Sequence, residues 1–354
     1  MKKVYNLAII GFGGMALNHY KELSKNTVPI KIAGVYDIDE SRMDAAREKG
    51  LNTYSSLDEA LNDDNVDMVL VATYNTNHGE ISEKALMAGK HVLCEKPVTP
   101  TSIELERLIR ISKQCNKVFC VDQNRRFNKD YILVKRTIDS GIIGKPYVIE
   151  SRVEGSRGVP EGWRCLKEYG GGMMLDWGVH LIDQIMLYIK EKVKTVYCKM
   201  YSVHYPEVDD NFHLTMTFES GLTAHIEVST NNFIKHPRWY ILGKDGTLQI
   251  DDWDCVGRVV KPICDDNTWD VEIAPDKAGP SKTMAKRNEN TIETIPLSAP
   301  TDVVDSLTPV YQQFIKAIEG EELYIKPEEC LRVLKVMEAA FESAEKEIAI
   351  NTDI

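Results

Sequence analysis

Residues 7–16 read LAIIGFGGMA, an apolar run that ends in a glycine-rich turn. The spacing G-x-G-x-x-A is the alanine form of the fingerprint in which a strand, a tight turn and a helix hold a dinucleotide. Gly11 allows the turn, and Gly13 lets the backbone approach a pyrophosphate. Gly14 and Met15 then open the helix, where backbone N–H groups attract phosphate charge. This stretch predicts a Rossmann-type domain at the start of the chain.

The first third of the chain alternates short apolar runs with helical stretches. We expect strands at residues 7–10, 31–36, 66–72, 91–94 and 118–121, and helices at 16–24, 41–49, 56–61, 81–88 and 102–115. Two of these helices begin with capping-box spacing, at Ser56 with Glu59 and at Thr101 with Glu104. Continuous apolar strands that alternate with helices are typical of a doubly wound parallel sheet. We therefore predict an α/β, dinucleotide-binding Rossmann domain over residues 1–123.

After residue 123, polar and apolar residues alternate over longer stretches. Strands are predicted at 147–154, 193–203, 212–218, 223–229, 239–242 and 247–251, with hairpin turns at 219–221 and 244–246. Helices are predicted at 174–189, 309–319 and 327–347, and the polar residues 265–298 are expected to form a long surface loop. This pattern predicts an α+β domain over residues 124–354 with a large, mostly antiparallel, open-faced sheet.

Composition narrows the classes of partner. The formal net charge is −11, from 43 Lys plus Arg against 54 Asp plus Glu. Nucleic acids and anionic membranes are bound through basic residues, so we expect neither as a partner. No apolar run reaches the roughly 18 residues of a membrane span, and no secretory leader precedes the first strand. The eight cysteines lack metal-ligand spacing, so we expect free thiols, no metal and a cytoplasmic protein.

An acidic residue follows the second predicted strand, at Asp37. A carboxylate about 20 residues after the glycine turn accepts hydrogen bonds from a ribose hydroxyl. With a second carboxylate at Asp39 and no adjacent arginine, a 2′-phosphate is repelled, so NAD is expected rather than NADP. The alternative is a simple glycine turn followed by a solvated acid.

Lys96 lies in Glu95-Lys96-Pro97, where the predicted strand at 91–94 ends. Because the carboxyl ends of parallel strands line one crevice, this amine should lie beside the nicotinamide half of the cofactor. The positive charge of an oxidised nicotinamide lowers the pKa of a nearby lysine and suits it to hydrogen bonding or proton transfer. A surface lysine at a strand end is the ordinary alternative.

A second constellation lies in residues 170–183, GGGMMLDWGVHLID. On a helix, Asp176 and His180 are four residues apart and share one face, within hydrogen-bond range. An imidazole oriented by a carboxylate is the usual general base near neutral pH. The glycines let the start of the helix approach a ligand. A polar stripe on an amphipathic helix is the alternative, and Asp183 shares the same face.

With residues 71–78 (VATYNTNH), Arg125-Arg126-Phe127 and residues 314–320 (FIKAIEG), these stretches resemble the glucose–fructose oxidoreductase / inositol dehydrogenase / rhizopine-catabolism (Gfo/Idh/MocA) family from end to end. The resemblance implies an NAD(P)-dependent dehydrogenase of sugars, cyclitols or their derivatives. It implies that Lys96 positions or protonates the reacting oxygen, and that Asp176 and His180 bind hydroxyls and transfer protons. It also implies a homodimer or homotetramer formed through the C-terminal sheet.

Other expected contacts follow from the same resemblance. Tyr74 replaces the proline of the family's Thr-Pro loop, either neutrally or by reshaping the pocket. Trp163-Arg164 resembles a pair that some members place on cofactor and substrate, a packed Trp being the alternative. His78 is expected chiefly to cap the helix that follows it. The remaining expected cofactor contacts are Thr73, Tyr74, Asn75, His78, Glu95, Lys96, Trp163 and Arg164, and the expected substrate contacts are Lys96, Arg126, Tyr74, Asp176 and His180.

The leading hypothesis is oxidation of a secondary hydroxyl of a sugar, cyclitol or glycoside to a ketone. His180, oriented by Asp176, removes the hydroxyl proton while Lys96 stabilises the developing charge. Three alternatives stay open. One is an NAD-dependent glycosidase-type enzyme that uses transient oxidation without net redox change. Another is a non-catalytic NAD-binding regulator. The third is an NADPH-linked reductase of imines, tetrapyrroles or dihydrodiols, against which Asp37 and Asp39 count.

Overall fold

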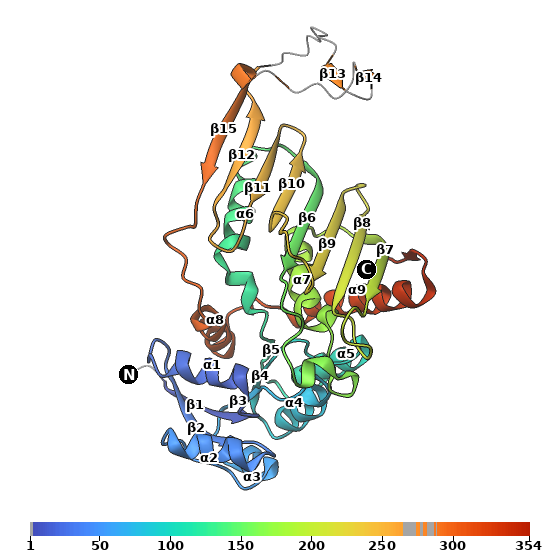
Figure 1. Cartoon of the computed structure of the whole chain (residues 1–354). Helices are drawn as coiled ribbons and strands as arrows, with labels where there is room; N and C mark the ends of the chain where they lie inside the picture. The colour runs from blue at the N-terminus through green and yellow to red at the C-terminus, as the bar shows by residue number, and fades with distance from the viewer. Residues whose placement is uncertain (1–2, 265–273, 277–278, 282–286, 288) are drawn as a thin grey trace.

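Two sheets organise the chain in a computed structural model that describes residues 3–264, 274–276, 279–281, 287 and 289–354 (Figure 1). The first sheet has the strand order β2-β1-β3-β4-β5, and each neighbouring pair is parallel. Its strands are β1 (Tyr5–Ile10), β2 (Ile30–Tyr36), β3 (Met68–Val71), β4 (His91–Cys94) and β5 (Phe119–Val121). All five predicted strands are confirmed, and the strand order reverses between β1 and β3, which is where open parallel sheets bind ligands.

Five helices connect these strands, as predicted. They are α1 (Gly14–Leu23), α2 (Glu40–Glu48), α3 (Leu57–Asn62), α4 (His78–Met87) and α5 (Ser102–Gln114). Both capping boxes form at the expected residues, because Ser56 Oγ accepts the N–H of Glu59 at 3.0 Å and Thr101 Oγ1 accepts that of Glu104 at 3.3 Å. The predicted doubly wound parallel fold is therefore confirmed in this part of the chain.

The second sheet has nine strands in the order β15-β12-β11-β10-β6-β9-β8-β7-β16, and only the pairing of β6 with β9 is parallel among its described neighbours. The predicted strands correspond to β6 (Pro146–Glu154), β7 (Val193–Tyr201), β8 (Asn211–Phe218), β9 (Thr223–Ser229), β10 (Trp239–Gly243) and β11 (Gly246–Ile250). Three strands were not predicted: β12 (Gly257–Pro262), β15 (Ile292–Leu297) and β16 (Ile350–Asn351). The prediction of a large, mostly antiparallel sheet is confirmed.

One expectation for the loop at 265–298 is wrong, because β15 lies within it. This strand is at the edge of the sheet, where a proline such as Pro296 costs no ladder hydrogen bond on the solvent side. A short hairpin of β13 (Ala274–Asp276) and β14 (Gly279–Ser281) also falls in this range. Residues 265–273, 277–278, 282–286 and 288 lie outside the described part of the chain.

Helices cover one face of the large sheet (Figure 1). They are α6 (Lys129–Asp139), which the sequence analysis missed, α7 (Val179–Tyr188) and α9 (Pro327–Lys346), with α8 (Thr308–Ile318) beside the first sheet. Along β9, half-exposed side chains alternate with buried ones, as expected when helices cover one face of a sheet. Within the described residues, no helix is both long and apolar enough to cross a membrane.

Helix α9 also packs against α5 of the first sheet, so it belongs to the cores of both sheets. Glu338 on α9 accepts hydrogen bonds from the backbone N–H and the hydroxyl of Ser102, both at 2.7 Å, at the first residue of α5. A carboxylate at a helix N-terminus is favoured by the helix dipole. This contact holds the two parts of the chain together near the candidate site.

Candidate active site

The glycine turn after β1 is built to hold a dinucleotide. Gly11 has φ +87°, and a Cβ there would lie 2.5 Å from the carbonyl oxygen of Ala72, at the end of β3. Only glycine fits between the two strand ends. Gly13 precedes α1, and no described side chain caps this helix, so the N–H groups at Gly14 and Met15 remain available to an anion. The residues present therefore fit a pyrophosphate at this turn.

A cavity of about 170 Å³, here named the Asp37 pocket, lies beside the turn. Its lining residues come from the ends of β1, β2 and β3 and from the turns and helices that follow these strands: Ile10, Gly11, Tyr36, Asp37, Ile38, Arg42, Leu57, Thr73, Tyr74, Asn77 and Ile81. The Asp37 carboxylate accepts hydrogen bonds from the N–H groups of Phe12 at 2.6 Å and Asp39 at 2.9 Å. It is thus a fixed acceptor in a largely apolar pocket, as a ribose hydroxyl requires.

The expectation that no arginine lies beside Asp37 is wrong. Arg42 lies on helix α2 and faces this carboxylate. Its Nη1 lies 3.3 Å from the Asp37 carboxylate, and its Nε lies 3.7 Å from that of Asp39. Burial lowers the pKa of Arg42, but Asp37 and Tyr74 outweigh it and raise the pKa above its ordinary value. A guanidinium near this acid is the group that accommodates a 2′-phosphate. Asp37 alone therefore does not decide between NAD and NADP.

A larger cavity of about 360 Å³, the Lys96 cleft, opens at the carboxyl ends of β3, β4 and β5. It is lined by Met15, Asn18, Ala72, Thr73, Asn75, His78, Glu95, Lys96, Asn124, Arg125, Trp163, Arg164, Asp176, Trp177 and His180. Lys96 Nζ donates to the Asp176 carboxylate at 2.9 Å and to the Asp176 carbonyl at 2.7 Å. The peptide bond between Lys96 and Pro97 is cis. The structure thus brings together the residues that the sequence analysis placed in two separate constellations.

The expected hydrogen bond between Asp176 and His180 is absent. Asp176 instead accepts from Lys96 and from Arg164 Nε at 3.3 Å, while His180 Nδ1 has no hydrogen-bond partner among the described residues. The reason is local. Met174–Gly178 forms a π turn before α7, and this wider turn moves residues four apart off the common face of an α-helix.

Charge and burial set the protonation of these groups. Burial raises the pKa of Asp176, but Lys96 and Arg164 outweigh it and hold the pKa below its ordinary value. Burial lowers the pKa of His180 well below 6.5, and the charges of Lys96, Arg125 and Arg238 lower it further. The cleft therefore holds an ionised carboxylate and a neutral imidazole at neutral pH. A neutral imidazole can accept a proton.

The glycine run at 170–172 positions this helix against the loop after β3. A Cβ on Gly171 would overlap the carbonyl oxygen of Arg164. Asp209 accepts the N–H of Met174 at 2.7 Å, which fixes the first turn. Asn75 Nδ2 donates to the Gly170 carbonyl at 2.7 Å and so joins the loop after β3 to the glycine run. Asn75 thus acts on the cleft through the backbone.

Tyr74 lies at the Asp37 pocket and His78 lines the Lys96 cleft. Contrary to expectation, Tyr74 is not in the Lys96 cleft and His78 is not a helix cap. Tyr74 lines the Asp37 pocket rather than the Lys96 cleft, with its ring centroid 4.6 Å from that of Tyr169 and 6.1 Å from that of Trp163. His78 makes no side-chain cap on α4. Its ring nitrogens lie 2.8 Å from the Pro97 carbonyl and 3.2 Å from that of Thr73, so it joins the loops after β3 and β4.

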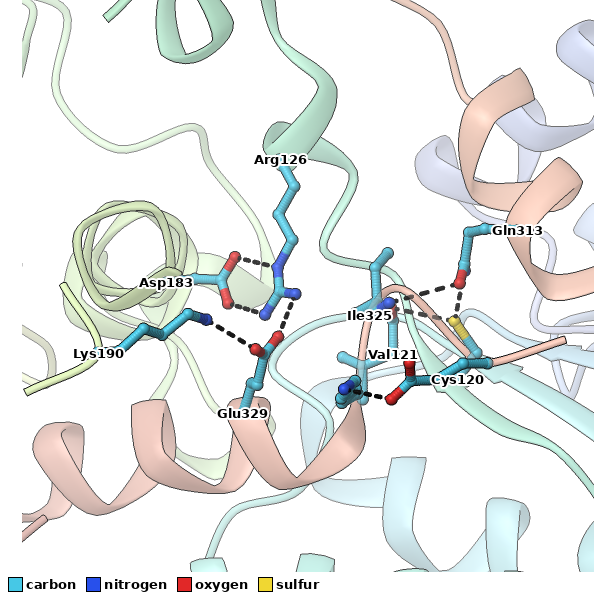
Figure 2. A network of polar contacts seen from close by, with 10 residues as sticks. Cys120, Val121, Arg126, Asp183, Lys190, Gln313, Ile325 and Glu329 are labelled. Carbon is cyan, nitrogen blue, oxygen red and sulfur yellow. Dashed lines mark hydrogen bonds and ion pairs between the residues drawn. The ribbon is translucent and has the colours of Figure 1, made fainter. Parts of the chain in front are cut away.

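Arg126, expected to contact substrate, is not brought into the cleft. Its side chain is 1% exposed and makes two hydrogen bonds to Asp183, at 2.8 and 2.6 Å, and one to Glu329 at 2.7 Å (Figure 2). Arg126 thus joins the turn after β5 to α7 and α9. Asp183, which was predicted on the same helix face as Asp176 and His180, is therefore the ion-pair partner of Arg126. The neighbouring Arg125 lines the cleft instead. Two adjacent arginines in a 3-10 turn point to different sides, and the sequence offered no signal to choose between them.

Behind the cleft, Glu95 belongs to a buried polar cluster. His19 Nε2 lies 2.8 Å from the Glu95 carboxylate and 3.2 Å from that of Asp122, and His19 Nδ1 lies 2.7 Å from the Tyr311 hydroxyl. Burial lowers the pKa of His19, but hydrogen bonds with Asp122 and Glu95 outweigh it and raise the pKa to about 9. An imidazolium between two carboxylates thus supports the backbone next to Lys96. No motif in the sequence marks His19, Asp122 or Tyr311, so none of the three was predicted.

The fold and the cleft define the class of protein, a dinucleotide-binding oxidoreductase. Two family models match the chain: an oxidoreductase family with an NAD-binding Rossmann fold over residues 5–123, and the GFO/IDH/MocA C-terminal domain over residues 131–249. The chain belongs to the Gfo/Idh/MocA family, as its motifs indicated.

Several relatives are similar over most of their length. The scyllo-inositol 2-dehydrogenase (NADP+) of Bacillus subtilis is 31% identical over 303 residues, covering 83% of this chain and 81% of that protein. A solved NAD-binding protein from Listeria innocua is 42% identical, with a TM-score of 0.94 over 99% of this chain and 100% of that one. A protein of gentamicin A biosynthesis, solved in complex with NAD, shares the fold at 21% identity and a TM-score of 0.80, covering 100% and 98%.

Proposed function

We propose that this protein oxidises a secondary hydroxyl of a sugar, cyclitol or glycoside to a ketone. The observation that carries the proposal is the Lys96–Asp176 ion pair, which lies with a neutral His180 in one cleft at the carboxyl edge of the dinucleotide-binding sheet. A base and a hydrogen-bond donor are the two groups that removal of a hydroxyl proton requires. The name of the Bacillus subtilis relative, an inositol dehydrogenase, supports the same substrate class.

In the proposed reaction, His180 accepts the hydroxyl proton at the ring nitrogen that carries no hydrogen in the neutral form. Lys96 donates a hydrogen bond to the same oxygen and stabilises the negative charge that develops there. Asp176 keeps Lys96 in place and accepts from a neighbouring hydroxyl. A bound nicotinamide cofactor would supply the acceptor for the hydride of the carbinol carbon.

The residues that would hold the cofactor are Gly11, Gly13, the N-terminus of α1 and Asp37. We propose NAD as the cofactor, because the Asp37 carboxylate is fixed by two backbone N–H groups. The observation that favours NADP as a second candidate is Arg42, 3.3 Å from that carboxylate. Rates measured with both cofactors decide between them: a higher kcat/KM with NADP would overturn the proposed preference.

The first test is a panel of hexoses, inositols and glycosides, with the formation of free NADH followed by absorbance. Net NADH formation on at least one compound is expected. Cleavage of a glycoside without NADH would instead support an enzyme that uses transient oxidation. Cofactor binding without any turnover would support a regulator.

The second test is the variant Lys96→Ala. It removes the donor at the reacting oxygen, so kcat is expected to fall roughly 10²–10⁴-fold while the Kd for the cofactor stays nearly unchanged. Lys49→Ala, at an exposed position after α2, is the matched control and should keep the wild-type rate. Unchanged turnover in Lys96→Ala would show that Lys96 is not the donor at the reacting oxygen.

We also propose that residues 1–123 and 124–354 act as cofactor and substrate domains, and that the open face of the large sheet forms a homodimer or homotetramer. The half-exposed residues along β9 support the second point. Light scattering of the purified protein tests it, and a monomer at micromolar concentration would contradict it.

A further inference from the structure

Arg125 differs from the other cations of the Lys96 cleft. The cationic side chains that line this cleft are Lys96, Arg125 and Arg164. Lys96 and Arg164 share the carboxylate of Asp176, at 2.9 and 3.3 Å. Arg125 makes no ion pair and no side-chain hydrogen bond with any residue in the described part of the chain. A guanidinium that lines a cleft and has no anionic partner in the protein can bind an anionic group of a ligand.

Aromatic rings hold the guanidinium of Arg125 in place. Its Cζ lies 4.1 Å from the ring centroid of Trp177 and 5.5 Å from that of Trp253. The two indoles lie 5.8 Å apart, and Arg238 lies 4.7 Å from Trp253 on the same stack. Stacking on aromatic faces leaves the N–H donors at the edge of the guanidinium free. These donors are therefore oriented before any ligand arrives, which lowers the entropy cost of binding.

The backbone of Arg125 is fixed as well. Its carbonyl accepts a hydrogen bond from Gln184 Nε2 at 2.9 Å, and Gln184 in turn accepts from Arg238 at 3.3 Å. Arg238 itself is paired with Asp130 at 3.1 Å. Asp130, one of the three carboxylates whose charge acts on Arg125 with Asp176 and Asp305, is thus already paired with Arg238.

Arg125 keeps its charge at neutral pH in spite of this environment. Burial and the charge of Arg238 lower its pKa to about 10. A half-buried cation without a counter-ion is destabilising, and an incoming anion removes that destabilisation. Binding an anion at Arg125 is therefore favoured beyond the new hydrogen bonds themselves.

We propose that Arg125 binds a carboxylate on the substrate, and that the substrate is an acidic monosaccharide of the uronate type. This inference rests on the proposed dehydrogenase function and specifies its substrate class. One guanidinium offers one bidentate pair, which matches the two oxygens of a single carboxylate. A phosphate dianion calls for more positive charge than one guanidinium supplies, and the other two cations that line the cleft, Lys96 and Arg164, are already paired with Asp176. A cleft of about 360 Å³ suits a single sugar ring next to the nicotinamide.

The test compares acids with the neutral sugars that differ from them at one carbon: D-glucuronate with D-glucose, and D-galacturonate with D-galactose. Binding to the NADH complex is measured by calorimetry, and turnover is measured with NAD. For at least one pair, the wild-type protein is expected to bind the acid roughly 10–100-fold more tightly than the neutral sugar, the gain of a charge-assisted bidentate pair. Arg125→Met is expected to bring the two sugars of that pair within about threefold of each other.

Two further variants separate recognition from general damage. Arg125→Lys keeps the charge but loses the bidentate geometry, so it should recover part of the preference. Arg258→Met, at an exposed position on β12, is the matched control and should keep the wild-type preference. A preference that survives in Arg125→Met would overturn the inference.

The outcomes also distinguish this inference from the proposed function. Efficient oxidation of neutral sugars or inositols, with no preference for the acids, would leave the dehydrogenase in place and overturn the role of Arg125. Tight binding of an acid that depends on Arg125, without oxidation of any sugar, would support the role of Arg125 and overturn the proposed dehydrogenase. Loss of NADH binding in Arg125→Met would assign this side chain to the cofactor and would also overturn the inference.

Discussion

The protonation of His180 is controlled by its neighbours rather than by a carboxylate partner. Lys96, Arg125 and Arg238 surround the ring with positive charge, and burial acts in the same direction. The usual pairing of an imidazole with an acid raises the pKa of the base, whereas this environment lowers it. The proposed base is therefore weak but unprotonated, and Lys96 must supply the stabilisation of the oxyanion.

A pH dependence follows from this arrangement. Protonated His180 cannot accept a proton, and its pKa lies well below 6.5. We expect kcat/KM for oxidation to stay level from about pH 8 to about pH 6, without the inflection that an ordinary histidine gives. In Arg125→Met one positive charge is lost, so the pKa of His180 should rise. The fall of kcat/KM on the acid side should therefore move to higher pH. A wild-type acid limb centred near 6.5 would contradict the assignment.

At the scale of elements, the π turn Met174–Gly178 decides the geometry of the site. It turns Asp176 toward Lys96 and Arg164, and it separates Asp176 from His180. Single π turns are often found at functional sites. The glycine run before it brings the backbone of residues 170–172 against that of Arg164, so this close packing sets where Arg164 lies.

Gly171→Ala tests this packing. The added Cβ would overlap the Arg164 carbonyl, so the segment that carries Arg164 must shift away from Asp176. We expect kcat/KM to fall roughly 10²-fold, the effect of a displacement of about 1 Å in a catalytic site, with a smaller loss of stability. Gly155→Ala is the control, because a Cβ there meets nothing within 4 Å. Equal rates in the two variants would show that the packing is unimportant.

The strands that could be predicted from the sequence differ in burial from those that could not. The strands β1, β3, β4 and β5 are buried almost throughout, so their apolar runs are continuous and easy to identify. Strand β15 lies at a sheet edge and has no buried residue, and polar residues and a proline interrupt its apolar ones. Lys96, Asp176 and His180 were found because motifs mark them. The π turn, the partner of Asp176 and the choice between Arg125 and Arg126 depend on contacts between distant segments, which spacing along one chain does not encode.

At the scale of the whole molecule, Arg126 joins three elements far apart in the sequence. It links the turn after β5 to Asp183 on α7 and Glu329 on α9, and Lys190 also donates to Glu329 at 2.8 Å. Removing one partner of a buried ion pair leaves the other charge without compensation.

Arg126→Met is expected to lower the free energy of unfolding by about 3–5 kcal/mol, measured in urea, because Asp183 stays buried and unpaired. The control is Arg136→Met. That arginine pairs with Asp302 at the surface, where the two side chains are 51% and 64% exposed, so about 1 kcal/mol or less is expected. If Arg126→Met lost no more stability than the control but raised KM strongly, Arg126 would belong to the substrate site after all.

The position of the last two helices has a consequence for synthesis on the ribosome. The parallel sheet is encoded first, yet Tyr311 on α8 completes the polar cluster around His19, and Glu338 on α9 binds the start of α5. Both partners are translated only after β15, when every strand of the large sheet except β16 has been made. Until they emerge, His19 lacks one of its hydrogen bonds and one side of α5 lacks its cover. The nascent N-terminal domain must therefore wait for the end of the chain to reach its final packing, and chaperones have that interval in which to bind it.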